Sequence, residues 1–129
     1  MAENGLDEQF VEKQRERLEQ LRDELARIVR GMEEDQRDRA EDEEDFTEHD
    51  SGDMSQSLFT REMDATVEQM AEKRLQSVAR ALEKIEEGTY GLSDESGEQI
   101  PKGRLEVVPE AVYTVEEQQR REKERRPPV

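Results

Sequence analysis

The sequence predicts a mainly α-helical protein: a long antiparallel helical hairpin (a coiled coil), a small C-terminal lobe and a last helix. Charged residues make up 43% of the 129 residues and hydrophobic residues only 30%, which suits long helices that bury a narrow stripe better than a compact globule. Apolar residues recur at helical spacing over two long stretches. Glycine, proline and apolar residues then crowd together from residue 88 onward. We therefore expect the hairpin at residues 1–87 and the lobe with its helix at residues 88–129.

The first predicted helix runs from Leu6 to about Asp45. Its apolar residues keep the three- and four-residue spacing of a coiled-coil seam, and no proline interrupts them. Beyond Met32, aspartates occupy the continuing positions, so nothing apolar is expected to hold this end to a partner. The expected seam consists of Val11, Leu18, Leu21, Leu25, Ile28 and Met32.

The second predicted helix begins near Asp53 and ends at about Glu87. It follows a segment rich in turn-forming and capping residues, 46–52. Two long helices with a short connection form an antiparallel hairpin, which places an acidic tip, near residues 41–55, far from both chain ends. The apolar register drifts in the middle of this helix, so we expect imperfect packing there. The expected seam consists of Leu58, Met63, Val67, Met70, Leu75, Val78, Leu82 and Ile85.

The stretch after Gly88 is punctuated by glycine and proline, which predicts a small lobe of turns and short strands. So few residues cannot form an independent core, and we expect the lobe to dock on the open end of the hairpin, near Leu6 and Phe10. The last helix is predicted to start at Thr114. Residues Thr114 and Glu117 have the spacing of a capping box, in which each side chain binds the other's backbone N–H.

Charge and composition narrow the possible functions. The formal net charge is −16, and residues 33–53 carry twelve carboxylates against two arginines. Such a chain is repelled by phosphate backbones, so we expect no direct nucleic-acid binding and instead a basic protein surface as partner. Without cysteine there is no disulfide or thiolate metal site. No apolar run is long enough to cross a membrane, and the N-terminal residues lack a signal-peptide pattern. We expect a soluble, cytoplasmic monomer.

Enzymatic activity is not expected. The sequence contains no Ser/His/Asp arrangement and no phosphate-binding glycine loop. His49 is the single histidine, and we interpret it as an exposed residue near the tip. The sequence calls for no cofactor.

Residues 85–118 read IEEGTYGLSDESGEQIPKGRLEVVPEAVYTVEEQ, and this stretch resembles the C-terminal zinc-finger region of the DksA/TraR family. The four cysteine positions of that finger are filled by hydroxyl residues and one carboxylate, which make a poor zinc site. The resemblance therefore implies a finger-like lobe without zinc. The former ligand positions are Ser93, Ser96, Thr114 and Glu117. The matched residues are Ile85, Glu86, Gly88, Tyr90, Gly91, Gly97, Ile100, Arg104, Leu105 and Pro109.

The resemblance also implies a partner. Members of the family insert the hairpin into the secondary channel of RNA polymerase, where an Asp-x-x-Asp-x-Ala motif at the tip approaches the catalytic centre. Ungapped counting places the motif on residues 50–55, with both aspartates present and serine in place of alanine. The implied protein is a zinc-free transcription regulator that modulates initiation. Its expected partner-binding residues are Asp50, Asp53, Met54 and Ser55.

Other interpretations stay open. Asp50 and Asp53 could be solvated acids that cap the second helix. A Gre-type transcript-cleavage factor also presents an acidic hairpin tip, and a general stress coiled-coil protein need not act on polymerase at all. The family's guanosine tetraphosphate positions are mostly not basic here, so we expect action without that alarmone; they fall on Met70, Lys73, Ser77, Val108 and Gln118.

Overall fold

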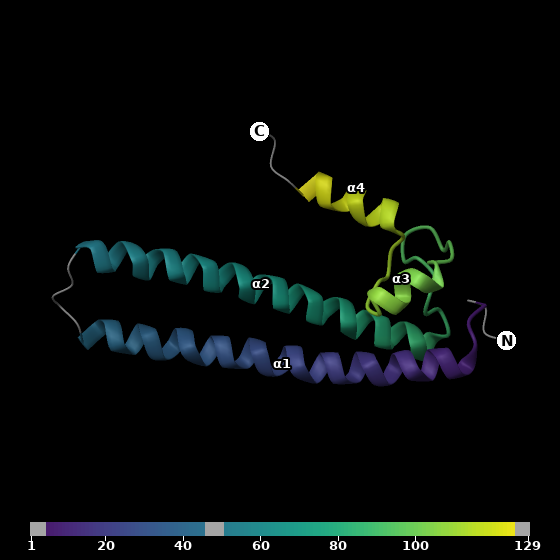
Figure 1. Cartoon of the computed structure of the whole chain (residues 1–129), viewed down its shortest axis with the longest axis horizontal. Helices are drawn as coiled ribbons and strands as arrows, with labels where there is room; N and C mark the ends of the chain where they lie inside the picture. Colours follow the sequence, from purple (N-terminus) through teal and green to yellow (C-terminus); the bar gives the residue numbers. More distant parts are fainter. Residues whose placement is uncertain (1–4, 46–50, 126–129) are drawn as a thin grey trace. The chain divides into compact units, whose positions relative to one another are not determined.

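The computed structural model of the chain describes residues 5–45 and 51–125, with side chains at 5–34, 62–63 and 65–125. Its elements are four helices: α1 (Glu8–Asp45), α2 (Ser51–Glu87), α3 (Lys102–Val107) and α4 (Val115–Arg125) (Figure 1). The predicted helical fold class is confirmed. The second helix begins two residues before the predicted start, which is within the usual uncertainty of helix ends.

The chain forms two compact units. One, the lobe unit, combines residues 1–22 with residues 76–129, and the other, the arm unit, consists of residues 23–75. Within each unit α1 and α2 lie side by side and antiparallel (Figure 1). None of the described helices has the length and apolar character needed to cross a lipid bilayer.

The helix seam is well packed in the lobe unit. Leu18 on α1 and Val78 on α2 are completely buried, and Ala81 and Ile85 continue the same face of α2. An ion pair between Arg15 and Glu86, with an N···O distance of 2.7 Å, ties the two helices together on the surface. The predicted coiled-coil seam is therefore confirmed at this end.

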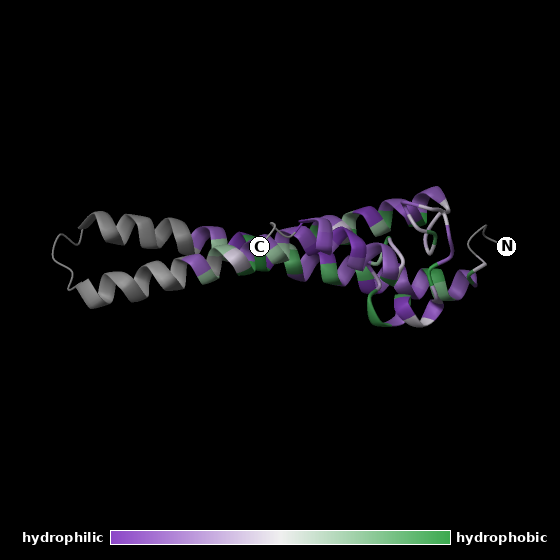
Figure 2. Ribbon diagram, turned by 90° about the horizontal axis from the view of Figure 1, so that it is seen from above, coloured by the Kyte–Doolittle hydropathy of each residue, from purple (hydrophilic) through white to green (hydrophobic). Residues whose placement is uncertain are grey.

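In the arm unit the predicted seam is confirmed at Leu25, which is 6% exposed, but is wrong at several other positions. Four of its expected members, Ile28, Met63, Val67 and Met70, are 47–67% exposed. For the three residues of α2, the reason is the five-residue step from Met70 to Leu75, which moves the earlier apolar residues off the face that α2 buries. In the coloured part of the ribbon hydrophilic residues predominate, with hydrophobic residues interspersed along α1 and α2 (Figure 2).

The lobe contains a short helix where strands were expected. Among the described residues, the only ladder pairing is an isolated antiparallel bridge between Leu92 and Gln99. α3 follows Pro101, whose carbonyl accepts hydrogen bonds from the N–H groups of Arg104 and Leu105 at 3.0 and 3.2 Å. The prediction of short strands was wrong because Pro101 before this helix and Gly103 inside it are poor helix formers, and because Leu105 is its only buried residue, so no apolar periodicity indicates a helix.

Two glycines turn the chain from α2 back onto α1. Gly88, with φ +79°, ends α2 in a Schellman motif: its N–H binds the Ile85 carbonyl, and the next N–H binds the Lys84 carbonyl. Gly91, with φ +89°, lies so close to Leu6 that a Cβ atom would be 2.8 Å from its Cδ1. The lobe therefore docks where the sequence predicted.

A buried polar network fastens the lobe to α1. The Gln14 side chain is 1% exposed, and its Nε2 donates to the Tyr90 hydroxyl at 3.0 Å and to the Leu105 carbonyl at 2.8 Å. The Tyr90 hydroxyl donates in turn to the Pro109 carbonyl at 2.8 Å. Burial raises the pKa of Tyr90, so the hydroxyl stays protonated and keeps donating. Leu105, which is fully buried, completes this core.

Candidate functional site

The structure describes only part of the residues predicted for the hairpin tip. Asp50 lies outside the described residues, and Asp53, Met54 and Ser55 belong to the beginning of α2 with side chains outside the described set. Their role in partner binding stays a prediction. The structure instead describes two other groups of polar side chains, one in each unit.

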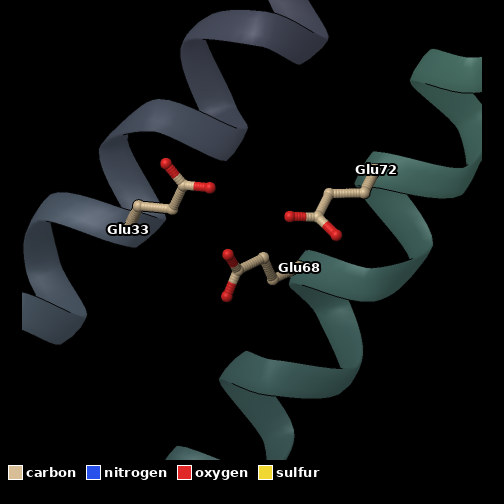
Figure 3. A group of neighbouring side chains, drawn as sticks. All are labelled: Glu33, Glu68 and Glu72. Atoms are coloured by element: carbon tan, nitrogen blue, oxygen red, sulfur yellow. The ribbon is translucent and has the colours of Figure 1, made fainter.

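In the arm unit, three carboxylates meet between the helices. Glu33 of α1 and Glu68 and Glu72 of α2 point toward one another (Figure 3), and their ligand oxygens all lie within 4.8 Å of one another. Glu68 and Glu72 are half-buried because α2 turns this face, and not its methionines, toward α1. Sequence reasoning missed this group, because spacing along one helix does not reveal which residues face it from the other.

In the lobe unit, the four former cysteine positions come together around one carboxylate. Glu117 accepts hydrogen bonds through Oε1 from the Ser93 hydroxyl at 2.6 Å and from the Thr114 N–H at 2.8 Å. The Thr114 hydroxyl accepts from the Glu117 N–H at 3.2 Å, which confirms the predicted capping box. Hydrogen bonds from Ser93, then Ser96 and the Thr114 backbone, lower the pKa of Glu117 to about 2. Glu117 therefore stays ionised and binds α4 to residues 93–96.

The next residue of the same turn, Asp94, binds α2. Arg80 donates to both carboxylate oxygens at 2.9 Å, and the Lys84 ammonium donates to Oδ1 at 2.7 Å. The Lys84 side chain is only 2% exposed, so Asp94 is the counter-ion of a buried charge. The hydrogen bonds from Arg80, followed by those from Lys84, lower the pKa of Asp94 to about 2.

The third residue of the turn, Glu95, binds α4. Its carboxylate pairs with Arg120 and Arg121, and the Arg121 guanidinium lies over the Tyr113 ring at 4.0 Å from its centroid. Three consecutive side chains thus bind α4, α2 and α4 again. We call this group the polar clasp; it consists of Ser93, Asp94, Glu95, Ser96 and their partners Arg80, Lys84, Thr114, Glu117, Arg120 and Arg121.

The polar clasp does not fit zinc. A structural zinc site needs four ligands, usually thiolates or imidazoles. Here the corresponding positions supply three neutral hydroxyls and one carboxylate, whose Oε1 already accepts two hydrogen bonds at 2.6 and 2.8 Å. The donor set and its hydrogen bonding therefore both disagree with the metal that a C4 finger holds.

Sequence reasoning anticipated part of this site. It identified the four positions and the capping box of Thr114, but it assigned no contact to Asp94 or Glu95. The roles of Asp94 and Glu95 were missed, because their partners lie ten to twenty-five residues away in sequence. A possible signal was the placement of two acids inside a lobe bordered by basic residues of α2 and α4.

Comparisons with known proteins agree with this architecture. The chain matches the prokaryotic dksA/traR C4-type zinc finger over residues 88–123. It is 46% identical over 63 residues to General stress protein 16O of Bacillus subtilis (strain 168), covering 48% of this chain and 39% of that protein. It is 34% identical over 77 residues to the RNA polymerase-binding transcription factor DksA of Caulobacter vibrioides (strain NA1000 / CB15N), covering 60% of this chain and 54% of that protein. The chain thus spans about half or less of these two relatives.

A solved structure extends the likeness to the helices. Transcription factor DksA2 from Pseudomonas aeruginosa has a TM-score of 0.68 and 28% identity, covering 92% of this chain and 87% of that one. The residues that build the lobe, among them Gly88, Tyr90, Gly91 and Leu105, fall within or beside the matched finger region. With its helical hairpin and its finger-like lobe, the chain belongs to the DksA/TraR family, as a member without cysteine.

Proposed function

We propose that this chain is a transcription regulator that binds RNA polymerase through its hairpin and modulates initiation. The observation that carries the proposal is the combined match of lobe and hairpin to DksA-type proteins, one of which is named as an RNA polymerase-binding transcription factor. The lobe supports this role mechanically, because it fastens the bases of α1 and α2 together through Gln14 and Tyr90. A hairpin fastened at one end can present its other end to a channel.

In this proposal the acidic end of the hairpin enters the secondary channel of the polymerase. Residues 33–53 carry a net charge of about −10, and charge of this density is attracted to basic channel walls and repelled by nucleic acid. Asp50 and Asp53 would approach the catalytic centre, with Met54 and Ser55 beside them. There a carboxylate changes the positions of the polymerase's metal ions and mobile loops. It thereby alters the lifetime of promoter complexes without forming or breaking a covalent bond. The protein acts as a monomer in the cytoplasm and is not an enzyme.

The test is an open-complex lifetime assay with the polymerase core binding measured in parallel. We expect the wild-type chain to bind and to change the lifetime, and the variant Asp50→Asn/Asp53→Asn to bind with little effect on the lifetime. Asp42→Asn/Asp45→Asn is the matched control, because it removes the same charge from the same acidic stretch outside the motif. Equal effects of the two variants on the lifetime would show that Asp50 and Asp53 act only through their charge and would contradict a specific role of the motif. Absence of binding at moderate salt would refute the proposal.

A transcript-cleavage role is separated by a second measurement. Backtracked elongation complexes incubated with the protein should show no accelerated RNA cleavage. Accelerated cleavage that Asp50→Asn abolishes would instead identify a Gre-type factor.

A further inference from the structure

We propose that the polar clasp replaces the zinc ion of the family's finger, so that the lobe folds and holds α4 against α2 without any metal. The proposal concerns the folding of this chain and does not rest on its action on polymerase. It starts from the disagreement between the donor set of the clasp and the requirements of zinc.

The first argument is that the four positions are still brought together. Ser93 and Glu117 are 24 residues apart in sequence, yet the Ser93 hydroxyl donates to Glu117 Oε1 at 2.6 Å. Thr114 donates its N–H to the same oxygen, and a hydrogen bond from Ser96 also acts on this carboxylate. One anionic oxygen thus accepts hydrogen bonds from both segments, and the groups at the former ligand positions act as donors to it instead of as metal ligands.

The second argument is that the centre of the clasp, Ser93 with Glu117, is internally satisfied. The Ser93 oxygen accepts hydrogen bonds from the N–H groups of Glu95 and Ser96 at 3.0 and 3.2 Å while its proton goes to Glu117. Ser93 and Glu117 are 5% and 8% exposed. Buried polar groups that find all their partners give a unique arrangement, whereas unsatisfied ones destabilise it. Nothing in this arrangement requires an ion.

The third argument is that the clasp connects more elements than the capping box alone. Asp94 joins the turn to α2 through Arg80 and Lys84, and its N–H donates to the Val112 carbonyl at 2.8 Å. Glu95 joins the same turn to α4 through Arg120. A zinc ion cross-links two pairs of ligands that are distant in sequence. The Glu95 ion pair cross-links the same turn to α4, and the Asp94 ion pairs add a connection to α2.

Two unfolding measurements on the full chain test metal independence. Urea unfolding followed by near-UV circular dichroism reports on the lobe, because both tyrosines of the chain, Tyr90 and Tyr113, lie in the lobe unit and tryptophan is absent. We expect the same unfolding midpoint in chelator and in excess Zn²⁺, and no stoichiometric zinc by elemental analysis of the purified protein. Bound zinc at one ion per chain, or a midpoint that chelator lowers, would overturn the proposal.

Two sets of variants test the geometry. Ser93→Ala should lower the folding equilibrium constant by about 5- to 30-fold, as expected for the loss of a buried hydrogen-bonded group. Glu116→Ala, the exposed neighbour of the clasp carboxylate, is the control and should leave it within about twofold. If the two variants changed the folding equilibrium constant equally, the proposal that the clasp stabilises the lobe would be overturned.

The converse variant returns the ligands. Ser93→Cys/Ser96→Cys/Thr114→Cys/Glu117→Cys should bind one Zn²⁺ per chain, give the visible spectrum of tetrahedral Co²⁺ thiolate, and fold only with metal. A variant that binds no metal would show that the four positions do not meet, which would also overturn the proposal.

Discussion

The partly buried pair of Lys84 and Asp94 offers the sharpest test of the structure. Asp94→Asn keeps the size of the side chain but removes the charge that faces an ammonium of 2% exposure at 2.7 Å. Breaking a buried ion pair by removing one partner costs about 3–5 kcal/mol. Asp94 is itself 21% exposed and its second partner Arg80 is 35% exposed, so solvent screening reduces the expected loss to about 2–3 kcal/mol.

A double-mutant cycle separates the pair from its surroundings. Lys84→Met replaces the ammonium with an apolar side chain of similar length, and the double variant Asp94→Asn/Lys84→Met leaves no unpaired charge. The double variant should therefore be more stable than the sum of the single losses predicts, by about 1–2 kcal/mol. The free energy of unfolding is measured by urea titration, with near-UV circular dichroism reporting on the lobe.

The matched control is Glu98→Gln, an exposed acid that follows the same turn, for which we expect a change within about 0.5 kcal/mol. If Asp94→Asn costs no more than Glu98→Gln, or if the cycle is additive, the buried pair does not stabilise the lobe and the reasoning is refuted.

Two further predictions concern acid stability and the helix seam. The pKa values of Asp94 and Glu117 are lowered from 3.8 and 4.5 to about 2; the stability that these ionised groups contribute is therefore present above about pH 4.5 and lost as the pH falls towards 2. Near-UV circular dichroism against pH should show this loss, and a lobe whose stability does not change over this interval would contradict it. Leu18→Ala should cost about 2–5 kcal/mol because Leu18 is fully buried, whereas Met70→Ala, at 67% exposure, should change stability by less than about 0.5 kcal/mol; similar urea midpoints for the two would contradict the register of α2.

The sequence by itself determined the two long helices, the start of the last helix and the family pattern. Helical periodicity gave α1 and α2 nearly their full length, and the spacing of Thr114 and Glu117 predicted the start of α4, because each of these signals is local. The fold class and the docking of the lobe near Leu6 and Phe10 also followed, since so short a lobe has no other apolar surface to cover.

Only the tertiary structure decided which faces and charges meet. The apolar residues Met63, Val67 and Met70 have helical spacing, and the five-residue step to Leu75 predicts imperfect packing. Which of the two faces of α2 is buried depends on the register against α1, and the sequence of one helix does not specify it. Likewise, residues 93–95 look like an ordinary polar turn. Their function as a clasp arises because the fold brings α2 and α4, distant in sequence, within the short range at which hydrogen bonds and ion pairs to that turn form.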